Sequence, residues 1–541
     1  MTKADAPHLD HHDIQGNILK AYARYNMPRA RYVFYSIHHG ATGRQFVRML
    51  TGLITSAAKW GDNPGAVERP LATTNLAFTY AGLAKLGVPQ KSLQSFPQEF
   101  CMGMAARADI LGDDGPSAPE HWDPIWCDSA KPVHIWLSIN AASESQLEAR
   151  YREICDCLQR CNGDGAGIEQ LCGHRGADGR ADLPYQSATA LLNEAGNPTP
   201  KEHFGFTDGI SNPFFKGCGG NPANVIGGGK PTRGDPATPQ GWAPLETGEF
   251  ILGYRDEAFE YPAAPIPRML AMNGTFMVYR KLHQNVASFK RYTQARGEAL
   301  CPHHGVQKLR AKMAGRWDNG APLSRFATPE SAAAFSEDLA QATEALKQAD
   351  SAAAQRSAQA AYATLRLKLT GFNYSDDLAG AACPIGAHIR RTNPRGALEY
   401  GVEGAYNTPG ALVNRRRILR RGLPYGSSEQ SPSDEGDHGI IFMALNANIE
   451  RQFEFVQQQW VNYSNDFKLA NDKDPLIGNQ ALNDTGKPCG RMVIQADPDG
   501  QQPPFFCDKL PRFVETRGGD YFFVPSISAL CMIGDGLIDP T

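Results

Sequence analysis

Residues 274–282 read Gly-Thr-Phe-Met-Val-Tyr-Arg-Lys-Leu, a run rich in β-branched and aromatic side chains that predicts a β-strand. Val286, Phe289 and Tyr292 follow it at the spacing of one helix face. The same order occurs near the start of the chain, with a predicted strand at residues 31–37 and a predicted helix at about 42–58. This repeat of a strand and then a helix predicts a duplicated domain.

The first of these units extends outward into a recognisable α+β pattern. Predicted strands at residues 74–80 and 133–139 are followed by an amphipathic helix at residues 144–158. Strand, helix, strand, strand and helix in this order are typical of an antiparallel sheet with helices packed on it, of the ferredoxin-like kind. The fold class is therefore predicted as two ferredoxin-like domains.

A Gly- and Pro-rich loop at residues 216–246 separates the two predicted domains. It indicates an N-terminal domain over residues 1–245 and a C-terminal domain over residues 246–541. The other predicted elements of the second domain are two late strands and a helix between them (440–445, 521–526 and 449–461).

A helical insertion is predicted within the second domain at about residues 328–368, which are rich in Ala, Gln and Glu. Thr328-Pro329-Glu330 is a helix start, with threonine as the cap and proline in the first turn. We expect one or two surface helices that act as a lid or an interaction arm rather than in chemistry.

Composition excludes several classes of protein. Of the 541 residues, 41% are hydrophobic and 21% are charged, which is typical of a globular chain. A formal net charge of -3 argues against a general nucleic-acid binder. The first residues lack the apolar stretch of an export signal, and no window approaches the ~18 consecutive apolar residues of a membrane span. The twelve cysteines form no C-x-x-C pairs and are expected to be reduced thiols in a cytoplasmic protein.

A single histidine, His388, lies in the stretch Cys383–Arg395. A small, turn-prone lead-in precedes it, and three arginines and Asn393-Pro394 follow. A neutral imidazole flanked by guanidinium groups suits a planar ligand with a central metal and carboxylates at its edge, and haem is such a ligand. The absence of C-x-x-C-H predicts attachment without thioether bonds. The alternative is an ordinary histidine in a partly exposed loop.

A second candidate site is the loop Gly205–Pro213, which contains Asp208 between glycines. An Asp-Gly pair is ordinarily a turn, because aspartate satisfies its own backbone there. The functional interpretation is a carboxylate on a tight loop whose backbone lies against a flat ligand.

A third candidate lies within residues 415–426, where five arginines occupy seven positions. Such a run is compatible with a nucleic-acid patch. Ile418-Leu419 and Leu423 interrupt it, however, and favour a strand whose alternate side chains face opposite ways. At least one arginine is then expected to point inward, where it needs an anionic partner.

These sites, taken in order, resemble the dye-decolourising peroxidase family, particularly its longer members without a signal peptide. The resemblance covers most of the chain. The family-like motifs are Asp13–Leu19, Gly205–Pro213, Gly248–Tyr254, Gly315-Arg316-Trp317 with Gly320–Leu323, Cys383–Arg395, Ile418–Gly426 and Arg517–Ser526.

The resemblance implies a non-covalent haem b, held mainly by the second domain. His388 would be the axial iron ligand, Asp208 the distal acid–base residue and Arg420 the distal arginine. The implied activity is reduction of hydrogen peroxide and oxidation of small organic donors, such as dyes and phenolics, through a high-valent iron–oxo intermediate. The residues expected to line the macrocycle or to hold its propionates are Gly209, Ile210, Ser211, Asn393, Pro394, Arg395 and Arg420.

Some details of the resemblance stay open. Some relatives place an asparagine at the position of Gly422, so the role of that asparagine is not carried over. An acid is expected to hydrogen-bond the second nitrogen of His388. The unranked candidates for this acid are Asp472, Asp474 and Glu515.

Arg420 and Arg421 are neighbours in the predicted strand, so only one of them reaches the site from a regular backbone. The resemblance chooses Arg420, and Arg421 is expected to be a solvated surface charge. Tyr425 and Trp460 are conceivable electron relays, although packing is the commoner role of such side chains.

Three functions are therefore compared. The first is a haem peroxidase with no nucleic-acid or membrane partner. The second is a haem-binding or haem-handling protein of the same fold, with incidental peroxidase activity. The third is a metal-free module in which the arginine run at residues 415–421 binds RNA.

Overall fold

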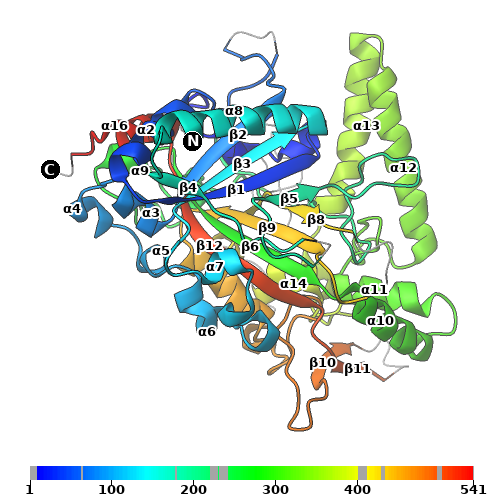
Figure 1. Ribbon diagram of the computed structural model, residues 1–541. Coiled ribbons are helices and arrows are strands. Elements are labelled where there is room, and N and C mark those ends of the chain that lie inside the picture. Colours follow the sequence, from blue (N-terminus) through cyan, green and yellow to red (C-terminus); the bar gives the residue numbers. More distant parts are fainter. Residues whose placement is uncertain are drawn as a thin grey trace.

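A computed structural model describes residues 9–61, 65–176, 179–219, 229–230, 242–399, 411–427, 433–495 and 503–539. The predicted boundary loop at residues 216–246 lies largely outside these ranges. Within them, one ten-stranded antiparallel sheet runs through the molecule, with helices on its outer side (Figure 1). A separate hairpin is formed by β10 (Gly490–Ile494) and β11 (Phe505–Leu510).

The N-terminal half has the predicted ferredoxin-like order. Its strands stand in the spatial order β4-β1-β3-β2. Helix α2 (Gly40–Thr51) follows β1, and α8 (Glu144–Asn162) connects β3 to β4. The strands of this half are β1 (Arg29–Ile37), β2 (Ala72–Phe78), β3 (Ile135–Ala141), β4 (Ile168–Gln170) and β5 (Gln186–Thr189), which pairs with β1.

Helix α2 is shorter than the predicted helix at residues 42–58. It ends at Thr51, because the residues after it form backbone hydrogen bonds with the N-terminal segment instead. The amide of Gly16 donates to Thr55, and the amide of Ala57 donates to Ile14. The apolar spacing that predicted the helix therefore continues past Thr51, where the helix ends.

The C-terminal half repeats the same topology. Its strands stand in the order β12-β6-β9-β7. With β7 and β8 counted as one position, because both pair with β9, this order is fourth, first, third, second within the half, as in β4-β1-β3-β2. This order confirms the duplicated α+β fold. The strands are β6 (Thr275–Gln284), β7 (Leu419–Arg420), β8 (Leu423–Tyr425), β9 (Gly439–Asn446) and β12 (Val514–Val524). The boundary near residue 245 stays a prediction, since the two halves share one sheet.

Two hydrophobic layers flank the sheet, as alternation along a strand requires. Val33 and Tyr35 of β1 face outward and pack with Phe46 of α2. Tyr32 and Phe34 face inward, where they meet aromatic side chains of the C-terminal half such as Tyr279. Because β5 also lies beside β8, the sheet curves around this shared inner core like a barrel (Figure 1).

The seam between the halves is short and is reinforced by a buried side chain. β2 and β12 pair only through Phe78 and Phe523. Beyond that pair, the Nε2 group of Gln15 donates to the carbonyls of both Leu76 and Pro525, each at 2.8 Å. Its Oε1 accepts from the amide of Leu76 at 2.9 Å. Gln15 is fully buried, so one amide side chain substitutes for ladder hydrogen bonds across the seam.

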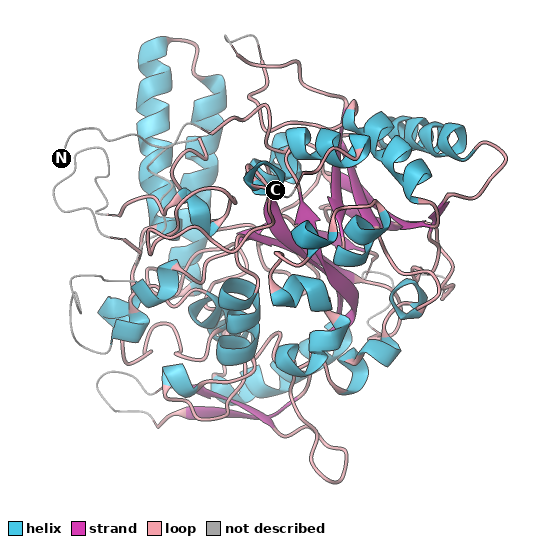
Figure 2. Ribbon diagram, turned by 90° about the vertical axis from the view of Figure 1, so that its left-hand side faces the viewer, coloured by secondary structure: helices cyan, strands magenta, loops and turns pink. Residues whose placement is uncertain are grey.

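The predicted insertion is a helical hairpin of α12 (Pro329–Gln348) and α13 (Ala352–Thr370), and it projects from the body in both views (Figures 1 and 2). Thr328 caps α12 as predicted, with Pro329 at its first position.

The helix predicted at residues 449–461 consists of π-helical turns, η10 (Glu450–Glu454) and η11 (Val456–Val461). The longer remaining helices are α10 (Val286–Leu300), α11 (Gly305–Ala314) and α16 (Ile527–Asp535). Short helices connect the rest: α1 (Gly16–Leu19), α3 (Tyr80–Lys85), α4 (Gln90–Leu93), α5 (Gln98–Met102), α6 (Ala108–Leu111), α7 (Pro124–Cys127), α9 (Arg268–Ala271) and α15 (Ala411–Asn414).

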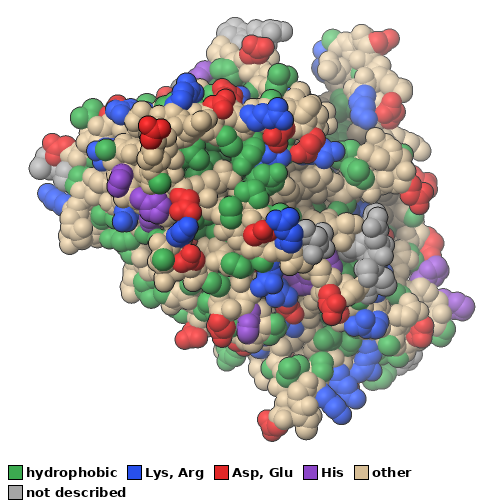
Figure 3. Space-filling view, in the orientation of Figure 1, with side chains coloured by type: hydrophobic (Ala, Val, Ile, Leu, Met, Phe, Trp, Pro, Cys, Tyr) green, Lys and Arg blue, Asp and Glu red, His purple; other side chains and the backbone are tan. Residues whose placement is uncertain are grey.

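Surface properties agree with the composition. Basic and acidic side chains are interspersed over most of the face shown in Figure 3. All twelve cysteines are free thiols. Among the described residues, no helix combines the length and the apolar character needed to cross a membrane.

Stability in acid is expected to depend on His134, at the start of β3. Its Nδ1 accepts the Ile37 amide at 2.7 Å, so this nitrogen cannot carry a proton while the bond exists. Burial lowers the pKa of His134 from 6.5 to about 4. Between these values the unfolded chain binds the proton and the folded chain does not. The free energy of unfolding therefore falls as pH drops from 6.5 towards 4, by up to about 3 kcal/mol from this residue.

His134→Asn should reduce that pH dependence, because the amide oxygen keeps an acceptor near the position of Nδ1 and does not titrate. Urea unfolding at pH 7, 5 and 4 measures the effect. His39→Asn, at an exposed neighbour, serves as the control. An unchanged slope in His134→Asn would assign the acid sensitivity to other groups.

Candidate functional site

A cavity of about 320 Å³ lies on the outer side of the C-terminal half of the sheet. Its floor is formed by β6, β9 and β12, and α14 (His388–Thr392) and the π-helical turns stand opposite. In the N-terminal half, side chains of α2 and α8 fill the corresponding layer. Among the residues that the structure describes, the two halves thus share a topology, but this layer is packed with side chains in the first half and leaves room for a ligand in the second. The floor residues are Arg280, Leu282, Ile440, Phe442, Val514 and Thr516.

His388 is the first residue of α14 and lines the cavity. Its Nδ1 lies 2.9 Å from Oδ2 of Asp474, which is completely buried. The other oxygen of Asp474 accepts the amides of Leu476 and Ile477, at 2.8 and 3.0 Å. Burial opposes the charged imidazole, but the charge of Asp474 outweighs it and raises the pKa of His388 above its usual value. The carboxylate fixes the ring orientation and leaves Nε2 available to a ligand.

The other two candidate acids have different partners. Asp472 accepts from Arg491 at 2.8 Å, and Glu515 pairs with Arg517 at 2.6 Å. Of the three acids, Asp474 alone contacts His388. Which acid does so depends on how the 472–477 turn folds, and no pattern in the sequence indicates it.

The loop carrying Asp208 is shaped by a buried glutamate that the sequence did not single out. Glu202 accepts the amides of Phe204 and Phe206, both at 2.8 Å, and the amide of Asp208 donates to the carbonyl of Pro200 at 2.7 Å. Gly209 has a positive φ of 74°, which a residue with a side chain rarely adopts. This turn presents the Asp208 side chain to the cavity, where it is 45% exposed.

Asp208 forms an ion pair with Arg420 across the cavity wall. Nη1 of Arg420 lies 2.7 Å from Oδ1 of Asp208, and its Nη2 donates to the carbonyl of Ile210 at 2.7 Å. The same aspartate oxygen accepts the Gly209 amide. Burial would raise the pKa of Asp208, but the charge of Arg420 and this amide outweigh it and hold the pKa below its usual value. The carboxylate therefore stays ionised in mild acid.

Arg421 is not the solvated charge that was predicted. It points away from Arg420, as expected, but into the protein, where it donates to the carbonyls of Asn17 and Ile18 in α1 at 2.6 and 2.5 Å. Burial lowers its pKa to about 10. The predicted surface location of Arg421 is therefore wrong, because the far side of β7 is covered by the N-terminal segment.

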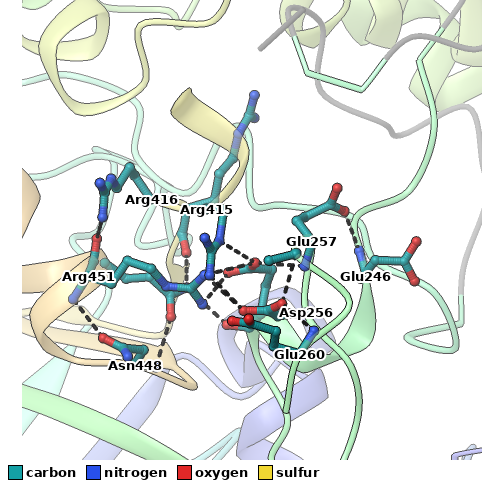
Figure 4. A network of polar contacts seen from close by, with 12 residues as sticks. Glu246, Asp256, Glu257, Glu260, Arg415, Arg416, Asn448 and Arg451 are labelled. Carbon is teal, nitrogen blue, oxygen red and sulfur yellow. Dashed lines mark hydrogen bonds and ion pairs between the residues drawn. The ribbon is translucent and has the colours of Figure 1, made fainter. Parts of the chain in front are cut away.

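The predicted strand through the arginine run is also too long. Arg415 and Arg416 form a turn after α15, and regular strand structure is confined to β7 and β8. Arg415 and Arg451 converge on Asp256, each at 3.0 Å (Figure 4). Glu249 also pairs with Arg451, and burial raises its pKa to about 7. These arginines are engaged in intramolecular ion pairs, which disfavours an RNA-binding patch.

Three buried arginines line the cavity away from Asp208. Nη2 of Arg316 donates to the hydroxyl of Ser211 at 3.1 Å, and Arg395 donates to the carbonyls of Thr370 and Phe372. Arg417 is 7% exposed, and within the described residues its Nε and Nη2 have no hydrogen-bond partner. Burial lowers the pKa of Arg417 to about 10. Such a buried cation needs an anion from a ligand.

Most of the predicted site residues meet at this cavity. The lining includes Asp208, Ile210, Ser211, His388, Asn393, Arg395 and Arg420. Gly209 and Pro394 are adjacent in the chain but do not line it. Trp460 does line it, whereas Tyr425 lies in the inner core. Arg316 lies in a family-like motif and Arg417 lies in the arginine run, but neither had a predicted role. The apolar residues Ile418 and Leu419 beside Arg417 were the sequence feature that could have indicated its burial.

The fold is a curved α+β sheet with a ligand-sized cavity on one side. His388 and Asp474 stand on one side of this cavity, and Asp208 and Arg420 stand on the other. Comparison with known proteins shows which class of protein has this arrangement. Residues 13–167 match the model of the DyP dimeric alpha+beta barrel domain, and residues 405–472 match the Dyp-type peroxidase, C-terminal model. Both models describe domains of the dye-decolourising peroxidase family, so the chain is similar to this family in both of its halves.

Relatives and solved structures cover nearly the whole chain. Dye-decolorizing peroxidase msp1 of Mycetinis scorodonius is 27% identical, over 96% of this chain and 86% of that protein. Multifunctional dye peroxidase DyP2 of an Amycolatopsis species is 27% identical, over 96% and 94%. An ancestral D-type dye decolorizing peroxidase superposes with a TM-score of 0.67 at 28% identity, over 97% and 99%. A dye-decolorizing peroxidase in complex with 2,6-dimethoxyphenol gives 0.66 at 27% identity, over 97% and 100%.

Proposed function

We propose that this protein is a haem peroxidase that reduces hydrogen peroxide and oxidises small aromatic donors. The observation that carries the proposal is the arrangement of an Asp474-oriented His388 opposite an ion-paired Asp208 and Arg420 in one cavity. A haem-handling protein needs the histidine and the cationic wall, but it has no need of an acid–base pair facing open space. The distal pair therefore favours catalysis over the alternative function.

The residues present fit a haem b bound without covalent links. His388 would ligate the iron through Nε2, since Nδ1 is engaged by Asp474. The unpartnered Nε and Nη2 groups of Arg417, together with Arg316 and Arg395, suit the carboxylates at the edge of the macrocycle. Ile440, Phe442 and Leu282 would offer apolar contacts to the macrocycle. When bound, the haem supplies the redox-active iron and stores oxidising equivalents.

The chain itself manages the proton and the charge of peroxide. Ionised Asp208 accepts a proton from one peroxide oxygen and returns it to the other, which makes the departing oxygen a better leaving group. Arg420 stays protonated, is fixed by the carbonyl of Ile210, and stabilises negative charge that develops beside it. Asp474 holds the imidazole of His388 in one orientation and increases its donor strength.

Arg420 and Arg421 offer a paired test of this assignment. Arg420→Leu should slow the reaction with peroxide by about 10²–10³ while haem stays bound, because one preorganised donor is lost. Arg421→Leu should leave that rate near the native value. It should instead lower the free energy of unfolding by about 1–3 kcal/mol, since the carbonyls of Asn17 and Ile18 lose their donor. Stopped-flow spectra and urea unfolding of both variants separate the two effects.

The test of the overall function is an absorption spectrum of the haem-reconstituted protein before and after one equivalent of peroxide, followed by addition of 2,6-dimethoxyphenol. A rapid spectral change that the phenol reverses is expected. A protein that binds haem but responds slowly to peroxide would support the haem-handling alternative. The twelve free thiols support a proposed location in a reducing compartment.

A further inference from the structure

Arg24 lies beside the loop that carries Asp208, although it is distant in sequence. It belongs to the 3₁₀ turn η1 (Tyr22–Tyr25). Its Nη2 lies 3.4 Å from the position that a Cβ atom would occupy at Gly209, the residue after Asp208. The Arg24 guanidinium therefore sits at the outer edge of the Asp208–Arg420 pair.

Arg366 approaches the same region from the helical hairpin. The base of α13 is fixed to the cavity wall, because the carbonyl of Leu369 accepts Arg316 and that of Thr370 accepts Arg395, at 3.1 and 2.6 Å. Arg366 lies one helical turn before Thr370 and is partly exposed. The insertion thus brings a cation close to the cavity wall from outside the duplicated fold.

These arginines are electrostatic neighbours. Burial lowers the pKa of Arg24, and the positive charges of Arg366 and Arg420 lower it further. Arg366 and Arg420 act in the same direction on the pKa of Arg316. Arg24 is therefore an electrostatic neighbour of two other arginines, Arg366 and Arg420, and of the carboxylate of Asp208, whose charge raises its pKa.

The charges at this entrance do not balance within the described part of the chain. Arg420 is paired with Asp208 at 2.7 Å, whereas no ion pair or side-chain hydrogen bond to a described residue is seen for Arg24 or Arg366. Within the ranges that the structure describes, Asp208 is the one carboxylate that acts on Arg24, against the positive charges of both Arg366 and Arg420. Such an excess of positive charge favours the approach of an anion and disfavours the approach of a cation. The side chain of Asp208, next to the glycine that Arg24 approaches, is 45% exposed and is therefore open to a ligand.

We propose that Arg24 and Arg366 determine donor specificity by binding the carboxylate or sulfonate group of an anionic aromatic donor at the entrance to the cavity. The proposal rests on the peroxidase function proposed above. It also gives the α12–α13 hairpin a role, because α13 supplies half of the anion-binding pair.

The experiment compares two donors that differ by one charged group: 2,6-dimethoxyphenol and its 4-carboxylate, syringate. The readout is the ratio of kcat/KM for syringate to kcat/KM for 2,6-dimethoxyphenol, which cancels effects common to both. In Arg24→Gln and Arg366→Gln this ratio should fall about tenfold, and further in the double variant, since each change removes one charge-assisted contact. Raising the ionic strength should lower the ratio in the native enzyme and have little effect in the double variant.

Arg356→Gln is the matched control, since Arg356 is an exposed arginine nearer the N-terminus of the same helix α13. Its ratio should equal the native one. An unchanged ratio in the double variant would overturn the proposal, as would loss of haem during purification, which would show that these arginines hold the haem carboxylates instead. Absence of turnover in the native enzyme with both donors would be failure of the peroxidase function itself, which distinguishes the two.

Discussion

Asp208→Asn is expected to slow the reaction with hydrogen peroxide by about 10²–10⁴-fold while haem remains bound, because the amide keeps the shape of the side chain but cannot accept the proton. Stopped-flow spectra under excess peroxide measure the rate. Asp318→Asn is the control, since Asp318 is an exposed aspartate outside the cavity lining. A native rate in Asp208→Asn would move the acid–base role to another group.

The pH profile of the same step follows from the lowered pKa of Asp208. The base is the ionised form, so the rate should persist in mild acid and fall only below the usual aspartate pKa of about 3.9. Arg420→Leu removes the main charge that opposes burial. Its acid limb should therefore move to higher pH, in addition to the loss of rate. An acid limb at the native position would mean that Arg420 does not control the ionisation of Asp208.

His388→Ala should abolish haem retention, which is the largest effect expected from a single substitution. The remaining contacts with the macrocycle come from the cationic wall and the apolar floor, and neither provides an iron ligand. Asp474→Asn should have a smaller effect, a weakening of haem affinity by about 10–100-fold, because it disturbs only the partner of the ligand.

The ratio of Soret to protein absorbance after reconstitution and gel filtration measures this retention. His304→Ala is the control, since His304 lies at the surface. Acid–organic extraction should release all haem from the native protein. Haem that stays with the polypeptide would contradict non-covalent binding, and full retention in His388→Ala would place the iron ligand elsewhere.

The fold was largely predictable because its signals are local. Strands such as β1 and β6 are long and apolar on both faces, and helices such as α8 and α12 begin at strong caps. The short edge strands β4 and β5 were missed, since three or four residues carry too little periodicity. The union of both halves in one sheet was missed as well, because strand pairing between distant segments has no local signal.

For the candidate site too, features with a local sequence signal were predicted and features that depend on distant segments were not. The positions of His388, Asp208 and Arg420 in one cavity agree with the hypothesis from sequence motifs. The roles of Glu202 and Asp474 were not predictable, because each depends on backbone amides that the folded loop brings together. Arg421 was misjudged because period-two alternation says which way a side chain points, but not what covers that side.

The Gln15 seam has a consequence for how this fold can be divided or recombined. A duplicated chain suggests halves that can be expressed or exchanged separately, yet cutting between them would remove the short β2–β12 pairing and the buried Gln15 bridge, and would expose those strand edges. Exposed edges of this kind recruit other strands and promote aggregation. Gln15 belongs to the N-terminal half but bonds to Pro525 at the far end of the chain, so the seam closes only once the last strand is in place. Separately expressed halves are therefore expected to be less soluble than the whole chain.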